Sequence, residues 1–337
     1  MVRCRMPAHR DKQMQKLILN FLRIVGAILI LVGIVAAYYG PLEMFVFYLF
    51  SEGGRFHYQG FGVGSFWFAA LVVQNIGYYI IAALFIPVGI GHVQLRRWAL
   101  TLTQLYVWFW LGAGILLVGN GILLIPSAFR IGLSQEVLLF RLVIIGVFSF
   151  VFLVLLPILA LWFYRSEKVK SVFEEHDSNR YWTERYPFPL LALLLLFVII
   201  ILAMHIAIFF QGSFPMFGLI MLGRQSAYMI SFCILVLGVL TYGMARLKIW
   251  AWWGSLVYIS LLAVSSMMSF SSHSFYDMIA MMDLPAYEME FFEKLTLLRD
   301  YHLVFLFAIP LLIAFGLIIY SKRYFVKGNN FHQLTAS

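Results

Sequence analysis

Two short stretches of the sequence place cations and tryptophan between long apolar runs. They are GHVQLRRWA at 91–99 and GMARLKIWA at 243–251. Guanidinium and ammonium groups bind phosphate, and tryptophan prefers the membrane interface, so the pattern predicts contact with anionic lipid headgroups. The candidate headgroup residues are Arg96, Arg97, Trp98, Lys248 and Trp250. The simpler interpretation, which we favour, is a tight turn whose cations only fix the side of the membrane.

Polar side chains inside or at the ends of apolar runs form a second group of candidates. The group is Gln74, Asn75, His205, Arg224 and Gln225. Because polar groups in a bilayer are costly, such residues are functional candidates by default. They could line a polar cavity, or they could bond one helix to another. No apolar run carries a charge at its centre, which argues against proton-coupled transport.

Histidine and methionine residues could also bind haem or a metal, because imidazole and thioether groups ligate iron and Cu(I). The candidate ligands are His205, His302, Met278, Met281 and Met282. Methionines cluster between 267 and 289, but acidic residues are interleaved with them, which suits an amphipathic segment that packs on other helices. The sequence has no CxxCH motif and no HxxxH-type spacing. We therefore expect no metal site and no cofactor.

Motifs of catalysis and nucleotide binding are absent from the sequence. It contains no P-loop, no GxGxxG motif after a strand, no HExxH and no GxSxG. An enzyme could still be built from scattered residues, but nothing in the sequence indicates one. The sequence therefore favours a protein that is not an enzyme.

The elements that position these residues must be membrane-spanning helices. The chain is 63% hydrophobic and only 12% charged, whereas soluble domains carry about 25% charged residues. Backbone groups in lipid must pair internally, and the apolar runs are continuous rather than alternating, which favours helices over a barrel. We predict an all-α integral membrane protein with eight transmembrane helices. The predicted spans are about 17–39, 66–93, 99–125, 138–164, 188–210, 227–245, 249–270 and 302–321.

The distribution of charge predicts the orientation of these spans. Most of the 24 Lys and Arg fall on one side if both termini are placed there. Positive charge stays on the cytoplasmic side, so the N- and C-termini are predicted to be cytoplasmic. The basic balance then reflects orientation and contact with anionic lipids. Nucleic-acid binding would need a basic soluble face, which the sequence does not indicate.

The two basic stretches also suggest an internal duplication, because Gly, Leu, Trp and Ala recur at the same four positions. A second match joins YGPLEMF at 39–45 to QGSFPMF at 211–217. We therefore predict two tandem four-helix repeats of the same orientation, related by an axis along the membrane normal. The first repeat spans 1–165 and carries an outer insertion at about 46–65. The second spans 188–337 and carries an outer segment at 271–301. A cytoplasmic link at 166–187 joins them.

Three functions fit these features. The first is a non-catalytic accessory or structural subunit of a larger membrane complex, which docks on a protein partner through its elaborated outer face. The second is a transporter or lipid-binding protein with a cleft between the two halves. The third is a haem- or copper-binding membrane component. We expect a multi-pass protein of the cell membrane, with a bacterial inner membrane as the hypothesis.

Overall fold

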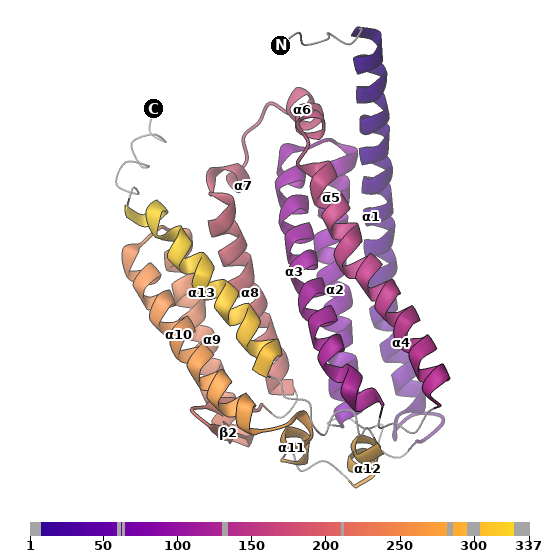
Figure 1. Ribbon diagram of the computed structural model, residues 1–337, viewed down its shortest axis with the longest axis vertical. Coiled ribbons are helices and arrows are strands. Elements are labelled where there is room, and N and C mark those ends of the chain that lie inside the picture. The colour runs from indigo at the N-terminus through magenta and orange to yellow at the C-terminus, as the bar shows by residue number, and fades with distance from the viewer. Residues whose placement is uncertain are drawn as a thin grey trace. The chain divides into compact units, whose positions relative to one another are not determined.

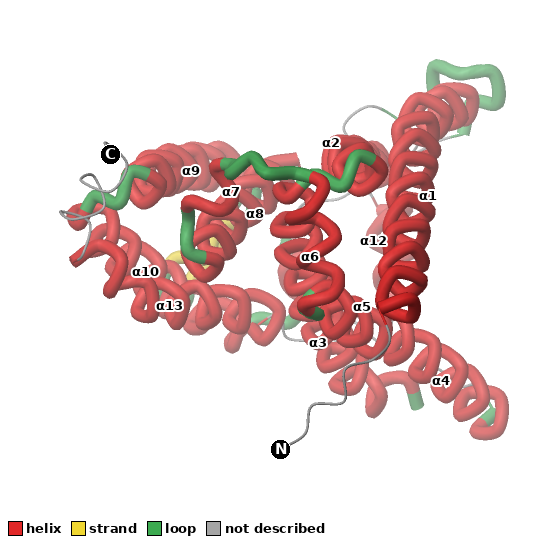
Figure 2. Tube along the Cα trace, turned by 90° about the horizontal axis from the view of Figure 1, so that it is seen from above, coloured by secondary structure: helices red, strands yellow, loops and turns green. Residues whose placement is uncertain are grey.

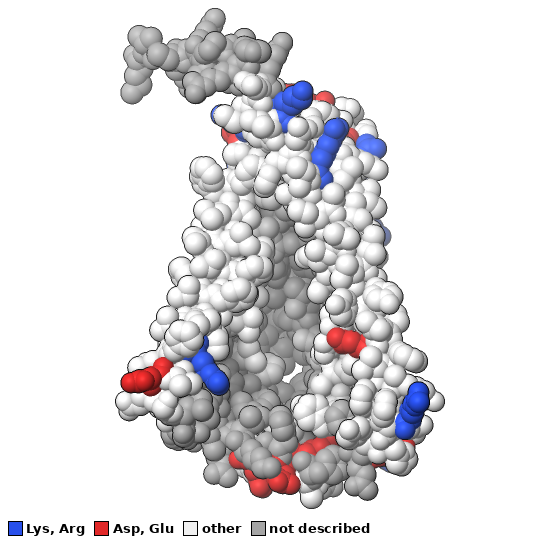
Figure 3. Space-filling model, turned by 90° about the vertical axis from the view of Figure 1, so that its right-hand side faces the viewer, with Lys and Arg blue, Asp and Glu red and all other residues white. Residues whose placement is uncertain are grey.

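The long apolar runs form long helices, as predicted (Figure 1). The computed structural model describes residues 8–58, 62, 65–129, 134–209, 212–281, 286–294 and 304–326. Within them, eight helices are long and apolar enough to cross a membrane, and these helices indicate a multi-pass membrane protein. On the face in Figure 3, Lys and Arg gather near one end of the helices, and the broad band below that end is almost free of charge.

The chain divides into two compact units, the first built from residues 1–115 and 148–186 and the second from 116–147 and 187–337. Elements up to the end of the link are α1 (Ala8–Phe50), α2 (Phe66–Val93), α3 (Arg97–Ala128), α4 (Gln135–Phe150), a π-helix (Val151–Leu155), α5 (Leu156–Tyr164), α6 (Glu167–His176) and α7 (Trp182–Arg185). After the link follow α8 (Phe188–Phe209), β1 (Phe214–Met216), β2 (Leu219–Met221), α9 (Gly223–Ala245), α10 (Ile249–Ser272), α11 (Phe275–Ala280), α12 (Ala286–Lys294) and α13 (Val304–Val326).

The structure confirms one predicted helix boundary and contradicts another. The break between the sixth and seventh spans is confirmed, because α9 ends at Ala245 and α10 begins at Ile249. The first span was predicted to end near 39, which is wrong, since α1 continues through Pro41 to Phe50. This extension is apolar and packs on α2, where the Phe47 and Phe68 rings lie 5.7 Å apart.

Glycines set the close packing of α1 on α2 in the first unit. Gly26, Gly33 and Gly40 follow one another at intervals of two helical turns and therefore lie on one face of α1. A Cβ at Gly26 would lie 2.7 Å from the carbonyl oxygen of Gly89, and a Cβ at Gly89 would lie 2.6 Å from that of Gly26. The two backbones are therefore in direct contact, as small residues allow between membrane helices.

A second close approach joins α3 to the π-helix. Pro157 has no N–H with which to bond the carbonyl oxygen of Leu153, four residues earlier. That oxygen faces Gly114 of α3, and a Cβ at Gly114 would overlap it. The π-helix, in which the N–H of Leu156 bonds the oxygen of Val151, absorbs the irregularity.

The charged link is folded and packs on the first unit. Ser166 caps α6 by accepting a hydrogen bond from the N–H of Val169. Val169, Val172 and Phe173 share one face of α6 and form a buried cluster with Leu22, Leu95 and Tyr164. Figure 2 looks onto the helix ends and shows α6 beside α5.

A two-stranded hairpin is the one departure from an all-α fold within the described residues. Strands β1 and β2 pair antiparallel, with Phe214 opposite Met221. Two serines one turn apart on α10 hold the turn of the hairpin. The Ser265 hydroxyl donates to the Pro215 carbonyl (2.7 Å) and accepts from the Phe217 N–H (3.0 Å). Ser269 likewise donates to the Leu219 carbonyl (2.9 Å) and accepts from the Gly218 N–H (3.0 Å).

The hairpin has a consequence for the second sequence match. Residues 39–45 are helical, whereas 214–216 form a strand, so this match is not carried into the local structure.

The apolar side of the segment after α10 packs on the second unit itself. Met278 of α11 is buried against Phe270 of α10, and Ile220 of β2 lies beside them. The rings of Phe270 and Phe307 stack at 4.5 Å. Packing within the unit therefore covers part of the apolar side that the sequence pattern predicts here.

Candidate functional site

The two basic stretches form turns of the same local geometry. Leu95 and Leu247 both adopt a φ of 54°, in the left-handed region. The Arg96 N–H bonds the Gly91 carbonyl at 2.7 Å, and the corresponding bond from Lys248 to the carbonyl of Gly243 is 2.9 Å. This bond bridges five residues and closes the end of the preceding helix.

The glycine in each turn is needed for space. A Cβ at Gly91 would lie 2.5 Å from the Cβ of Ala99, and a Cβ at Gly243 would lie 2.5 Å from that of Ala251. Trp98 and Trp250 also lie within 3.0 Å of these positions. The shared residues of the two stretches therefore build a tight turn, which accounts for their recurrence.

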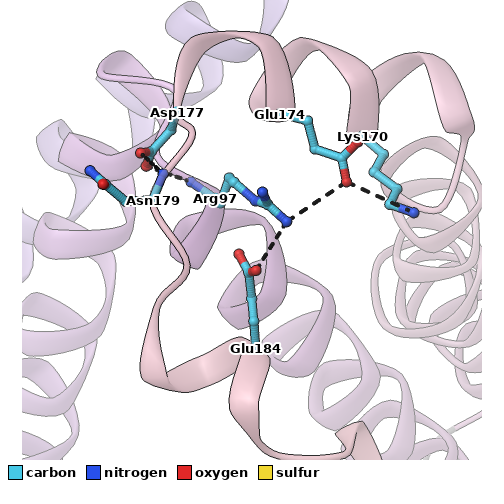
Figure 4. A network of polar contacts seen from close by, with 6 residues as sticks. All are labelled: Arg97, Lys170, Glu174, Asp177, Asn179 and Glu184. Carbon is cyan, nitrogen blue, oxygen red and sulfur yellow. Dashed lines mark hydrogen bonds and ion pairs between the residues drawn. The ribbon is translucent and has the colours of Figure 1, made fainter. Parts of the chain in front are cut away.

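In the first turn, Arg97 is enclosed by carboxylates of the link (Figure 4). Its Nη2 lies 3.0 Å from Glu184 and 3.8 Å from Glu174. Glu174 also lies 3.9 Å from Nζ of Lys170. These pairs fix α6 and α7 beside the start of α3.

Asp177 completes this network from a buried position, with 1% of its side chain exposed. One carboxylate oxygen accepts from the backbone N–H of Arg97 and the other from that of Asn179, each at 3.2 Å. Arg96 approaches to 3.8 Å. Burial alone would raise the pKa of Asp177, but these hydrogen bonds, one from Tyr181 and the Arg96 charge together lower it. Asp177 is therefore held as a carboxylate.

Below the network, His92 is completely buried and hydrogen-bonded at both nitrogens. Nδ1 lies 2.9 Å from the Val88 carbonyl and must donate to it, because a carbonyl can only accept. In the neutral ring Nε2 then accepts from the Tyr164 hydroxyl, 3.0 Å away. Gln104 bonds the Tyr164 carbonyl at 2.7 Å. The His92–Tyr164 hydrogen bond joins the ends of α2 and α5, and the Gln104 hydrogen bond joins α3 to α5.

Replacing Tyr164 with phenylalanine should lower the free energy of unfolding by about 1–3 kcal/mol, because Nε2 of buried His92 loses its donor. The midpoint of thermal unfolding in mild detergent measures the effect. Tyr228→Phe is the matched control, since Tyr228 is 75% exposed. Equal midpoints for the two variants would contradict the role given to this bond.

The second turn differs in its partners. Lys248 is exposed and Trp250 is 50% exposed. In the part of the chain that the structure describes, no carboxylate lies within ion-pair distance of Lys248. Arg246 lies over the ring of Tyr242 (5.4 Å). Of the five headgroup candidates, those of the second turn are therefore the more accessible, while Arg97 is occupied by the link.

Gln74 belongs to a polar cluster between α1 and α2. Its Nε2 lies 3.2 Å from Glu43 and 2.8 Å from the Tyr78 hydroxyl, which donates to Glu43 at 2.7 Å. Neighbouring Asn75 is buried and donates to the Leu71 carbonyl at 2.9 Å. Gln74 therefore hydrogen-bonds α2 to α1.

The remaining candidates that the structure describes are not brought together. His205 is exposed on α8 and bonds the Ile201 carbonyl at 2.8 Å. Arg224 and Gln225 are exposed at the start of α9. Met278 is buried and Met281 is 39% exposed, while Met282 and His302 lie outside the described residues. Among the described residues no group of three or more His, Cys, Asp or Glu could hold a metal ion.

Sequence reasoning missed the residues that complete the first turn: His92, Tyr164, Glu174, Asp177 and Glu184. A signal existed for the link, because its apolar residues at 169, 172 and 173 have helical spacing. The two turns hold charged groups and hydrogen bonds in fixed positions at the helix ends. The cations of the first turn are paired with carboxylates, and those of the second turn are accessible. Comparison with protein families, curated proteins and solved structures finds no match for this chain.

Proposed function

We propose that the chain is a non-catalytic accessory subunit of a larger membrane complex, with both termini and the link on the cytoplasmic side. In this orientation the β1–β2 hairpin faces outward. The observation that supports docking is the exposure of apolar side chains at the tip of this hairpin. Four hydrogen bonds to Ser265 and Ser269 hold the hairpin, yet Phe217 is 48% and Leu219 71% exposed.

A rigid apolar tip is suited to binding a protein. Because the backbone is already fixed, ordering it on binding costs little conformational entropy. Contiguous exposed apolar patches mark interaction surfaces, whereas single exposed apolar residues are ordinary. The partner is therefore a membrane protein with an apolar surface near the outer interface.

On the cytoplasmic side, the proposal includes contact with anionic lipids through the second turn. The exposed Lys248 and Trp250 supply a cation and an interfacial ring. This contact orients the subunit and requires no catalytic residue.

A photo-crosslinking amino acid tests the docking proposal when it replaces Leu219 in native membranes. We expect a crosslink to a second polypeptide, which also co-purifies in mild detergent. The matched control is the same replacement at Leu235, which is 64% exposed but lies within the long apolar helix α9. If position 219 crosslinks only to lipid and the protein purifies alone and monodisperse, the accessory-subunit proposal is wrong.

A further inference from the structure

The first unit contains an open groove of ≈ 580 Å³ on the outside of α3 and α5. Its walls are Trp108 and Leu111 of α3 and Ile158, Leu161 and Trp162 of α5, and Arg165 and Ser166, which follow α5, also line it. Leu111 and Leu161 belong to a buried cluster, whereas Trp162 is 78% exposed. The groove therefore has a packed apolar floor and tryptophan at its rim.

The rigidity of the groove comes from contacts at both ends. Toward the middle of the helices, Gly114 of α3 lies directly against the Leu153 carbonyl. At the other end, Gln104 of α3 bonds the carbonyl of Tyr164 (2.7 Å). These two contacts and the Leu111–Leu161 packing fix the spacing of the two helices, so the groove is a fixed feature of the unit.

Among the described residues, Arg165, like Lys168, makes no ion pair, in contrast to three other cations at this end of the unit. Arg96, Arg97 and Lys170 each lie within 4.0 Å of a carboxylate. For Arg165, no carboxylate within the described ranges lies at ion-pair distance, and its guanidinium instead lies 5.9 Å from the centre of the Trp108 ring. A guanidinium placed in this way can donate to an anion without first breaking an ion pair.

The position of the groove selects the class of ligand. It extends along α5 from Ile158 to Arg165, about 10 Å at 1.5 Å per residue. Arg165 directly follows the last residue of the candidate span Gln135–Tyr164, so it lies at the level of lipid headgroups. Apolar walls within the span and an unpaired cation at its edge match the two parts of a lipid with an anionic headgroup.

We propose that this groove binds one anionic glycerophospholipid, with an acyl chain along α3 and α5 and its phosphate on Arg165. The lipid is retained by the shape of the groove together with the unpaired cation. The site does not depend on the docking of a protein partner. None of the headgroup candidates of the two basic turns lines the groove.

Native mass spectrometry of the full chain in mild detergent tests this site. The probes are phosphatidylglycerol and phosphatidylcholine with identical acyl chains, and glycerol phosphate without chains. Retention of phosphatidylglycerol should exceed that of phosphatidylcholine by about fivefold, which corresponds to one cation near a headgroup. Glycerol phosphate should not be retained, because it cannot use the apolar walls.

Three variants separate the parts of the proposal. Arg165→Gln should reduce the preference for phosphatidylglycerol, whereas Lys168→Gln, which removes a charge at the same end outside the groove, should leave the preference intact. Ile158→Trp should reduce retention of both lipids by occupying the groove. An unchanged preference in Arg165→Gln, an equal loss in Lys168→Gln or full retention in Ile158→Trp would overturn the proposal. Retention of glycerol phosphate at the level of the lipid would assign the site to a soluble phosphate instead.

Discussion

Replacing Asp177 with asparagine should lower the free energy of unfolding of the first unit by about 2–3 kcal/mol. The two carboxylate oxygens accept from the backbone N–H groups of Arg97 and Asn179. An asparagine side chain has a single oxygen, so its NH₂ group must face one of these two donors. Arg96 loses its counter-charge at the same time. Faster protease cleavage in the link and a lower thermal midpoint in mild detergent measure the effect.

A control and a pH series distinguish this effect from a general loss of charge. Glu175→Gln should change the midpoint little, because the hydrogen bonds of Glu175 to described residues are exposed ones, to Gln15. The pKa of Asp177 is lowered in the fold, so its contribution is complete above the unfolded value of about 3.9 and is lost as pH falls through the lowered folded pKa. The difference between wild type and Asp177→Asn should therefore narrow below about pH 4. A difference that is constant from pH 7 to pH 3 would contradict the role of the carboxylate.

The sequence predicts the eight long helices because hydropathy over a window of residues is a local property. The turns at 91–99 and 243–251 are also local, and the residues that the two stretches share are those that the turn geometry requires. The extension of α1 past Pro41 was missed, since proline is normally read as the end of a helix. Here the apolar residues up to Phe50 and their packing on α2 outweigh that preference.

The candidate site is less predictable because its contacts join distant parts of the chain. Arg97 and Glu184 are far apart in sequence, and neither stretch alone indicates that they form an ion pair. The link has the composition of a solvated connection, and only the spacing of Val169, Val172 and Phe173 indicates a helix that docks. Interactions between a turn and a link thus require the structure.

The two turns illustrate how the same local sequence can serve different purposes. Their backbones agree at the left-handed Leu95 and Leu247. In the first turn, Arg96 and Arg97 form ion pairs with carboxylates of the link. In the second turn, Lys248 is exposed. The backbone of such a turn is encoded locally, and its chemistry depends on which segment covers it. The duplication of whole halves remains a prediction.

Replacing Gly26 with alanine should lower the free energy of unfolding by about 1–3 kcal/mol, although alanine is the better helix former by about 1 kcal/mol. The new Cβ would lie 2.7 Å from the Gly89 oxygen and 2.9 Å from the Val93 nitrogen. These are backbone atoms, so α1 and α2 must move apart. Separation weakens the contacts that Gly33 and Gly40 make further along the same face. The thermal midpoint in mild detergent should fall accordingly.

Gly77→Ala is the matched control for Gly26→Ala, because it lies in α2 and a Cβ there meets nothing within 4 Å. Helix propensity alone then determines the effect of Gly77→Ala on stability, so the thermal midpoint should stay unchanged or rise. Gly89→Ala should reproduce the loss from the other side, since its Cβ would lie 2.6 Å from the oxygen of Gly26. If Gly26→Ala and Gly77→Ala had the same midpoint, the backbone contact would not limit how closely α1 and α2 pack. The opposite signs expected for these two substitutions follow from position alone, because the chemical change is identical.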